Sequence, residues 1–106
     1  MTHIDWASDA LSVSRIIRAY DPRPGAHSTL RGSDVKLFGA RRTEGSGAAG
    51  EVLSIDGTGM VVACGDGGGA GGGAVLVTNV HPSGKRRLTP REWAAGRGIA
   101  VGERLS

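Results

Sequence analysis

The sequence has one cysteine, Cys64, only four aromatic residues and no long apolar segment. A single cysteine cannot form an intramolecular disulfide, and no apolar run approaches the roughly 20 residues that a helix needs to cross a bilayer. The N-terminal MTHIDWASD lacks the basic and apolar regions of a secretory signal. From these absences we expect a cytoplasmic protein with no membrane partner.

Motifs for catalysis and metal binding are also missing. The three histidines, His3, His27 and His81, stand at no recognised metal-ligand spacing, and Cys64 has no CxxC partner. The sequence contains neither the GxSxG nor the HExxH motif of hydrolases. Cys64 lies in an apolar segment without an adjacent base, which is typical of a buried, unreactive thiol. We therefore predict no catalytic residue and no metal site.

Glycine, in contrast, is abundant, with 19 glycines and four prolines in 106 residues. Because an interior glycine lowers helix stability by about 1 kcal/mol, this composition disfavours a helical bundle and favours short strands joined by turns. Apolar residues make up 39% of the sequence, so the chain is not of the disordered class. At this length the chain can hold one core, and we predict a single domain over residues 1–106.

A helix is predicted at about residues 9–20, capped by Ser8 or Asp9. It must end before Pro22, and the segment DPRPG at 21–25 predicts a rigid corner. Apolar residues recur at three- and four-residue steps and predict the face that docks on the core. The residues of this face are Ala10, Val13, Ile16, Ile17 and Tyr20.

From Ser33 onward the period changes to two, which predicts strands. Val35 and Leu37 alternate with Lys36 and Phe38 in a first strand that ends at Arg41 and Arg42. The dipeptide Asp56-Gly57, favoured at positive φ in tight turns, predicts a hairpin. The two strands of this hairpin are predicted at residues 51–55 and 60–64, and a further strand is predicted at residues 74–80.

The segment GDGGGAGGG at 65–73 has two interpretations. A phosphate-binding loop would need a following Lys-Ser/Thr and a helix N-terminus. The sequence instead continues with the β-branched AVLVTNV. We therefore predict a long, mobile hairpin loop at 65–73.

A second helix is predicted by a capping box near the C-terminus. Thr89 stands at the cap, Pro90 at the first helical position and Glu92 at the third. Trp93 is its expected anchor in the core, and an extended segment follows at 99–105. Five or six short strands at about 33–105, with a helix at each end, predict a small closed or nearly closed barrel.

Basic residues are concentrated in three separate elements. The net charge is +3 and the pI about 9.8, which suits a polyanionic partner without requiring one. If the fold gathers these residues on one surface, they predict phosphate binding; otherwise they are solvated faces. The candidate RNA-binding residues are Arg15, Arg18, Arg41, Arg42, Lys85, Arg86, Arg87 and Arg91.

An ordered set of motifs along nearly the whole chain resembles the C-terminal domain of the methionyl-tRNA formyltransferase family. The motifs are IDW at 4–6, RIIRAYDPRPGA at 15–26, VKL at 35–37, GEVL at 50–53, VVACGDG at 61–67, PSGKRRLT at 82–89 and VGERL at 101–105. The sequence departs from the family in Arg23, where an aromatic residue is common between the two prolines, and in a glycine-rich insertion at 68–73.

The resemblance implies an open Greek-key barrel of the oligonucleotide-binding type. Its basic face would lie along the initiator methionyl-tRNA near the acceptor stem, and the protein would be monomeric. Catalysis and 10-formyltetrahydrofolate binding would belong to an N-terminal formyltransferase domain, present in cis or in trans, so this chain would hold no cofactor. The alternative is a structural, interdomain module in a formyltransferase that acts on a nucleotide sugar or another small molecule.

Overall fold

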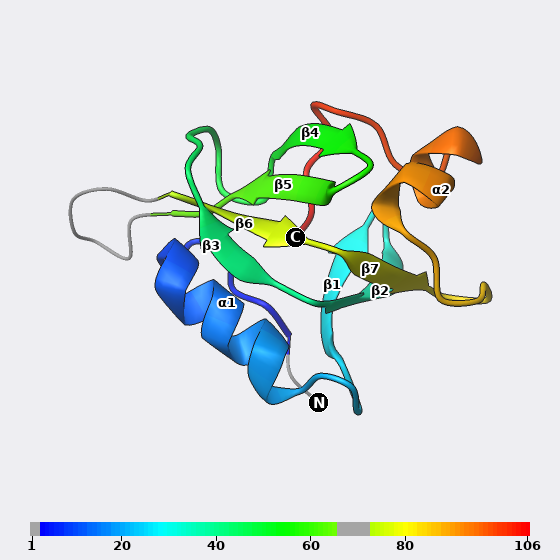
Figure 1. Cartoon of the computed structure of the whole chain (residues 1–106), viewed down its shortest axis with the longest axis horizontal. Coiled ribbons are helices and arrows are strands. Elements are labelled where there is room, and N and C mark those ends of the chain that lie inside the picture. Colours follow the sequence, from blue (N-terminus) through cyan, green and yellow to red (C-terminus); the bar gives the residue numbers. More distant parts are fainter. Residues whose placement is uncertain (1–2, 66–72) are drawn as a thin grey trace.

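The computed structural model describes residues 3–65 and 73–106, and it is mainly β with a helix near each end (Figure 1). Most of the predicted mobile loop at 65–73 lies outside the described residues. The helix α1 (Ala10–Ala19) crosses one side of the strands, and α2 (Pro90–Ala95) lies at the opposite end of the molecule. Among the described residues no helix is long and apolar enough to cross a membrane.

The strands form two antiparallel sheets. The three-stranded sheet has the order β1-β2-β7, and the four-stranded sheet has the order β3-β6-β5-β4. The first sheet contains β1 (Ala26–Leu30), β2 (Ser33–Phe38) and β7 (Asn79–Pro82). The second contains β3 (Arg41–Thr43), β4 (Val52–Asp56), β5 (Gly59–Ala63) and β6 (Ala74–Val77). The mainly β class is confirmed, although the described residues hold seven strands instead of the five or six predicted.

Two bends explain part of this difference. The strand predicted at 74–80 is interrupted at Thr78, so that β6 lies in one sheet and β7 in the other. Opposite this bend the chain passes from β2 to β3 at Gly39, which has a φ of 70°. A Cβ atom at Gly39 would overlap the Thr78 hydroxyl. The connection from β2 to β3 and the connection from β6 to β7 therefore pass side by side from one sheet to the other. Only glycine fits where these two connections touch.

The C-terminal segment connects the outer strands of the two sheets. Gly102 N–H donates to the Val52 carbonyl and Leu105 N–H to the Gly50 carbonyl, each at 2.8 Å. Ser106 and Thr29 exchange two backbone hydrogen bonds of 2.9 Å. The described strands thus form two separate ladders instead of one closed barrel, and residues 102–106 span the opening between β4 and β1.

Helix α1 begins and ends as predicted. The Asp9 carboxylate caps it by accepting the Ser12 N–H at 2.7 Å. Ala10, Val13 and Ile17 are buried against the core, whereas the Ile16 side chain is 38% exposed. The prediction that Ile16 belongs to the docking face was wrong, because Ser14 takes a buried position on that face and the helix is turned accordingly.

The β4–β5 hairpin and α2 are confirmed with small shifts at their ends. Asp56 pairs with Gly59, so the turn is made by residues 57 and 58. The positive φ, 143°, falls on Gly59 and not on Gly57 as predicted. Both hydrogen bonds of the capping box between Thr89 and Glu92 are present at α2. Trp93 is buried, as expected of the anchor of this helix.

Candidate nucleic-acid interface

The first basic group consists of four arginines on α1 and β3, called here the helix–strand arginines: Arg15, Arg18, Arg41 and Arg42. All four are exposed, and α1 packs directly against β3. The pKa of Asp9 is lowered, first by its hydrogen bonds with Ser12 and then by the positive charges of Arg15 and Arg42. The Asp9 carboxylate therefore lies near one arginine of α1 and one arginine of β3. The fold thus brings the arginines of the helix and the strand together.

The second group is the basic loop at residues 85–87, between β7 and α2. Its three side chains are exposed, and two of them have defined contacts. The Arg87 guanidinium lies over the Phe38 ring, 4.1 Å from its centroid. The Arg86 guanidinium lies 3.4 Å from the Glu92 carboxylate, and this contact lowers the pKa of Glu92 after the larger effect of the Thr89 N–H. Stacking and pairing hold these side chains in place at the surface.

Arg91 does not join the basic loop. It lies on α2, near the turn of the β4–β5 hairpin, where a Cβ atom at Gly57 would approach the Arg91 guanidinium at 3.3 Å. Its charge contributes to lowering the pKa of Asp56, after the hydrogen bonds that Thr58 donates. Although Arg91 follows Arg87 closely in the sequence, α2 places it toward the other sheet.

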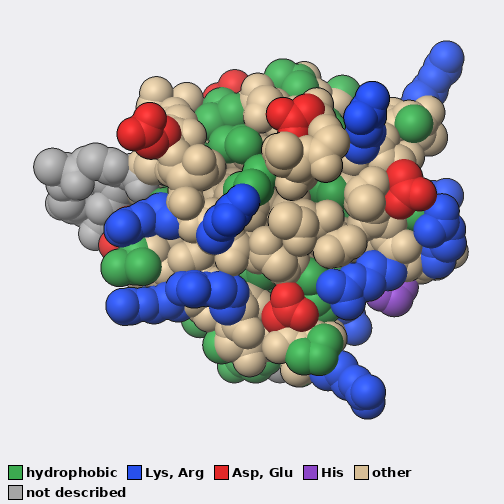
Figure 2. Space-filling model, in the orientation of Figure 1, with side chains coloured by type: hydrophobic (Ala, Val, Ile, Leu, Met, Phe, Trp, Pro, Cys, Tyr) green, Lys and Arg blue, Asp and Glu red, His purple; other side chains and the backbone are tan. Residues whose placement is uncertain are grey.

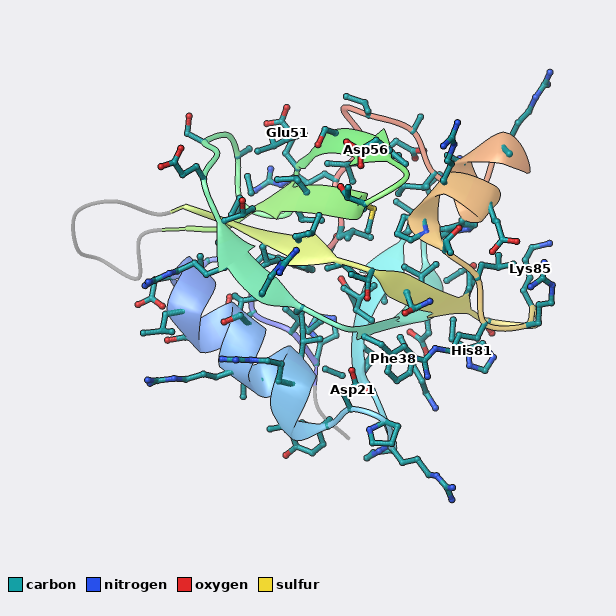
Figure 3. The ribbon with its side chains drawn as sticks, in the orientation of Figure 1. Asp21, Phe38, Glu51, Asp56, His81 and Lys85 are labelled. Carbon is teal, nitrogen blue, oxygen red and sulfur yellow. The ribbon has the colours of Figure 1, made fainter. Side chains whose placement is uncertain are left out.

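Both basic groups are visible on one face of the molecule (Figure 2). Lysine and arginine side chains gather over α1 and β3 on the left of the view and over the end of β7 and the following loop on the right. Asp21 lies between these two regions (Figure 3), and its carboxylate accepts the Gly39 N–H at 2.8 Å. The basic surface is therefore divided into two parts instead of being continuous.

Ion pairs in the described ranges 3–65 and 73–106 leave the helix–strand arginines free. The two pairs found there are Arg31 with Glu103 at 3.3 Å and Arg86 with Glu92 at 3.4 Å. The four arginines of α1 and β3 thus have no carboxylate partner within salt-bridge distance in that part of the chain. Their positive charge is available to an anionic ligand.

Cys64 follows β5 and is buried, with 4% of its surface exposed. Burial raises the pKa of its thiol to about 12, with a smaller effect from Asp9. A thiol with so high a pKa is a poor nucleophile at neutral pH. In the part of the chain that the structure describes, no cluster of three His, Cys, Asp or Glu residues could hold a metal.

The contact between Arg87 and Phe38 was missed in the sequence. The alternation of the sequence places Phe38 on the polar face of its strand, and it does not show which side chain covers the Phe38 ring. Arg87 comes from a loop far along the chain, and the register between β2 and β7 brings the two together. An aromatic residue on an otherwise polar strand face, together with a distant arginine cluster, is the signal that could have suggested the pair.

Comparison with known proteins identifies the class of domain. The sequence matches the family model described as formyl transferase, C-terminal domain, over residues 1–98. The chain belongs to this family, as its motifs predicted.

The matching curated relatives are methionyl-tRNA formyltransferases. The one from Magnetococcus marinus is 40% identical over 102 residues, which cover 96% of this chain and 31% of the relative. The one from Dechloromonas aromatica is 39% identical over 102 residues, with the same shares of both chains covered. The chain therefore spans about a third of the length of these relatives.

Solved structures of HypX from Aquifex aeolicus contain a similar fold. A HypX variant with six substitutions matches with a TM-score of 0.75 and 30% identity, over 95% of this chain and 18% of HypX. HypX in complex with tetrahydrofolic acid matches with a TM-score of 0.70, the same identity and the same coverage. The two-sheet architecture thus occurs as a small part of much longer chains.

Proposed function

We propose that this domain binds initiator methionyl-tRNA and positions its acceptor arm for formylation by a separate formyltransferase domain. The observation that carries the proposal is the exposure, on one face, of the helix–strand arginines and the basic loop. The helix–strand arginines, which have no carboxylate partner among residues 3–65 and 73–106, can contact phosphates directly and release the counterions condensed on the RNA. The names of the curated relatives favour methionyl-tRNA as the ligand.

The division of the basic surface suggests how the tRNA is held. With Asp21 between them, the helix–strand arginines and the basic loop would each contact a separate run of phosphates. Phosphate contacts fix register and orientation without reading bases. Such a grip suits a module that orients one end of a folded RNA.

The chemistry of formyl transfer is assigned to another domain, joined in cis or supplied in trans. This chain covers about a third of the length of the curated methionyl-tRNA formyltransferases, which leaves room in those proteins for a catalytic domain. In this proposal the site for 10-formyltetrahydrofolate and the catalytic residues lie in that domain.

Filter binding of initiator tRNA across a salt series tests the proposal. Each phosphate contact to duplex RNA is expected to contribute about −0.9 to the slope of log affinity against log salt. The double substitution Arg18→Gln and Arg41→Gln should weaken binding and reduce the slope by about 2. The matched control is Arg91→Gln with Arg97→Gln, which removes the same charge from α2 and the turn that directly follows it. This control should change the slope by less than half as much.

Two results would contradict tRNA binding at this face. One is an affinity that does not change with salt concentration. The other is an equal loss for the two double variants, because it would show that only net charge matters. A third double variant, Lys85→Gln with Arg87→Gln, tests the basic loop separately in the same assay.

The likeness to HypX favours one alternative, a structural module in a formyltransferase with a different substrate. HypX has been solved with tetrahydrofolic acid, so the same fold occurs in a folate-binding protein. A domain of that kind would bind tRNA no more tightly than a control RNA hairpin. Competition between initiator tRNA and such a hairpin separates the two functions.

A further inference from the structure

The outer face of the sheet β1-β2-β7 carries a row of four residues, called here the histidine row. The register pairs His27 of β1 with Lys36 of β2, and Lys36 with His81 of β7. His3 forms a bridge with His27 on the other side of β1. Because directly paired residues point to the same face of a sheet, all three histidines of the sequence lie in one line with Lys36.

Burial along the three strands shows that this row faces outward. Residues 26, 28 and 30 of β1, residues 35 and 37 of β2, and residues 80 and 82 of β7 are buried toward the core. His27, Lys36 and His81 occupy the alternate positions. His3 and His81 are exposed, while His27 and Lys36 are half-buried. The row is therefore a surface feature and not part of the core.

Planar groups line this face. The His3 and His27 rings meet edge to face, with centroids 4.9 Å apart. At the other end, Phe38 follows Lys36 on the same face, and the exposed Arg87 guanidinium stacks on it. His81 and Phe38 lie near each other at this end, with Lys85 farther out on the loop (Figure 3). Imidazole rings and guanidinium planes are the groups on which proteins stack unpaired bases.

We propose that the outer face of β1-β2-β7 binds a segment of unpaired RNA nucleotides, with bases stacked on His81 and Arg87 and phosphates held by Lys36 and the histidines. This inference rests on the proposed tRNA-binding function but concerns a surface separate from the helix–strand arginines. The face combines stacking groups with the cationic side chains Lys36, Lys85 and Arg87, as sequence-tolerant single-strand sites combine stacking with phosphate contacts.

Charged side chains of both signs surround the histidine row. From β2, Asp34 shares the outer face with Lys36, and Asp5 lies near His3 in a hollow at the N-terminal segment. Asp21 lies beside the Phe38 end, while Lys85 and Arg87 come from the basic loop. Three cations, Lys36, Lys85 and Arg87, and three carboxylates therefore lie on or beside this face.

The test uses the whole chain and a fluorescent oligouridylate of about 12 nucleotides, a length within the range of single-strand sites. Fluorescence anisotropy is measured in buffer with a chelator, across a salt series at constant pH. The protein should bind the oligouridylate, and the slope of log affinity against log salt should be about −2, or about −0.7 for each single-strand phosphate contact made by Lys36, Lys85 and Arg87.

Substitution locates the effect. Lys36→Gln should weaken binding and reduce the slope by about 0.7. His3→Gln with His81→Gln should weaken binding by about fivefold or more, because it removes imidazole rings from the face on which the bases stack. The control Arg18→Gln with Arg41→Gln should leave the affinity for the oligouridylate unchanged, although it weakens tRNA binding. An abasic oligomer of the same length and charge should bind more weakly than the oligouridylate, because it offers no base to stack.

The outcomes separate this inference from the proposed function. No binding of the oligouridylate, full affinity in the histidine variant, or equal binding of the abasic oligomer would overturn the inference. Each of these results leaves binding of tRNA to the helix–strand arginines unaffected. Conversely, binding of oligouridylate that Lys36→Gln weakens, without any binding of initiator tRNA, would support the surface and refute the proposed function.

Discussion

At Gly50 a single added methyl group should strongly disturb the fold. Its φ is 88°, in the left-handed region, and a Cβ atom there would overlap the Leu105 carbonyl oxygen. Its own carbonyl accepts the Leu105 N–H at 2.8 Å, and the Leu105 side chain is only 1% exposed. Gly50→Ala should therefore displace the segment that connects the two sheets.

Three costs add up in this variant. An alanine in the left-handed region costs roughly 1–2 kcal/mol. Exposing the Leu105 side chain costs about 1.5–3 kcal/mol, and the lost hydrogen bond costs about 1 kcal/mol. The expected loss in the free energy of unfolding is therefore roughly 3.5–6 kcal/mol, a large fraction of the roughly 5–15 kcal/mol of a typical domain.

Gly102 provides the matched control. Its φ is 95°, but no atom lies within 4 Å of the position of its Cβ. Gly102→Ala should therefore show only the backbone cost of roughly 1–2 kcal/mol. In urea denaturation with a slope of about 2 kcal/mol per M, the midpoint should fall by about 2 M for Gly50→Ala and by less than about 1 M for Gly102→Ala. Equal shifts would refute the reasoning that the C-terminal segment holds the sheets together.

Three further predictions concern other parts of the structure. Thr89→Ala removes one half of the capping box and should cost about 1 kcal/mol in the free energy of unfolding, measured by denaturation. Cys64 should resist a thiol reagent at about pH 8 in the folded protein and react only on unfolding, because burial raises its pKa; rapid labelling of native protein would contradict this. The pKa values of Asp9, Asp56 and Glu92 are lowered in the fold. The three ionised carboxylates therefore stabilise the fold when the pH is above their ordinary pKa values of about 4. This stabilisation is lost as the pH falls through the lowered pKa values. Urea midpoints measured from about pH 5 downward should fall, and replacing the three by Asn, Asn and Gln should flatten the curve.

Elements with local signals could be predicted from the sequence. Helix α1 has its cap, its apolar spacing and its proline stop within a few residues of one another, and the capping box of α2 is contained in four residues. The β4–β5 hairpin is specified by a turn between two apolar runs. In each case neighbouring residues determine the structure, so no distant contact was needed to infer it.

Strands that depend on distant partners were missed. In β1 the inward Ser28 replaces an apolar residue, because its hydroxyl accepts the Trp6 indole N–H at 2.9 Å and donates to the Ser106 carbonyl at 2.8 Å. The alternation that marks a strand is therefore hidden in AHSTL. In β3 the sequence Arg-Arg-Thr has no apolar residue, and pairing with β6 makes it a strand.

The candidate interface was partly visible in the sequence. Charge clustering identified the three elements that carry it, and the structure brings the α1 and β3 arginines together. The sequence could not show that α2 turns Arg91 toward the β4–β5 hairpin. Nor could it show the histidine row, because the histidines are far apart in the chain and only the register of the sheet aligns them.

The most direct test of the central claim is an NMR titration of the isotope-labelled chain with initiator tRNA. The account predicts that amide signals of α1, β3 and the basic loop shift or broaden first, while those of the β4–β5 hairpin, including Asp56 and Gly57, stay in place. Perturbation centred on the hairpin and Arg91, with the signals of α1 and β3 unchanged, would contradict it.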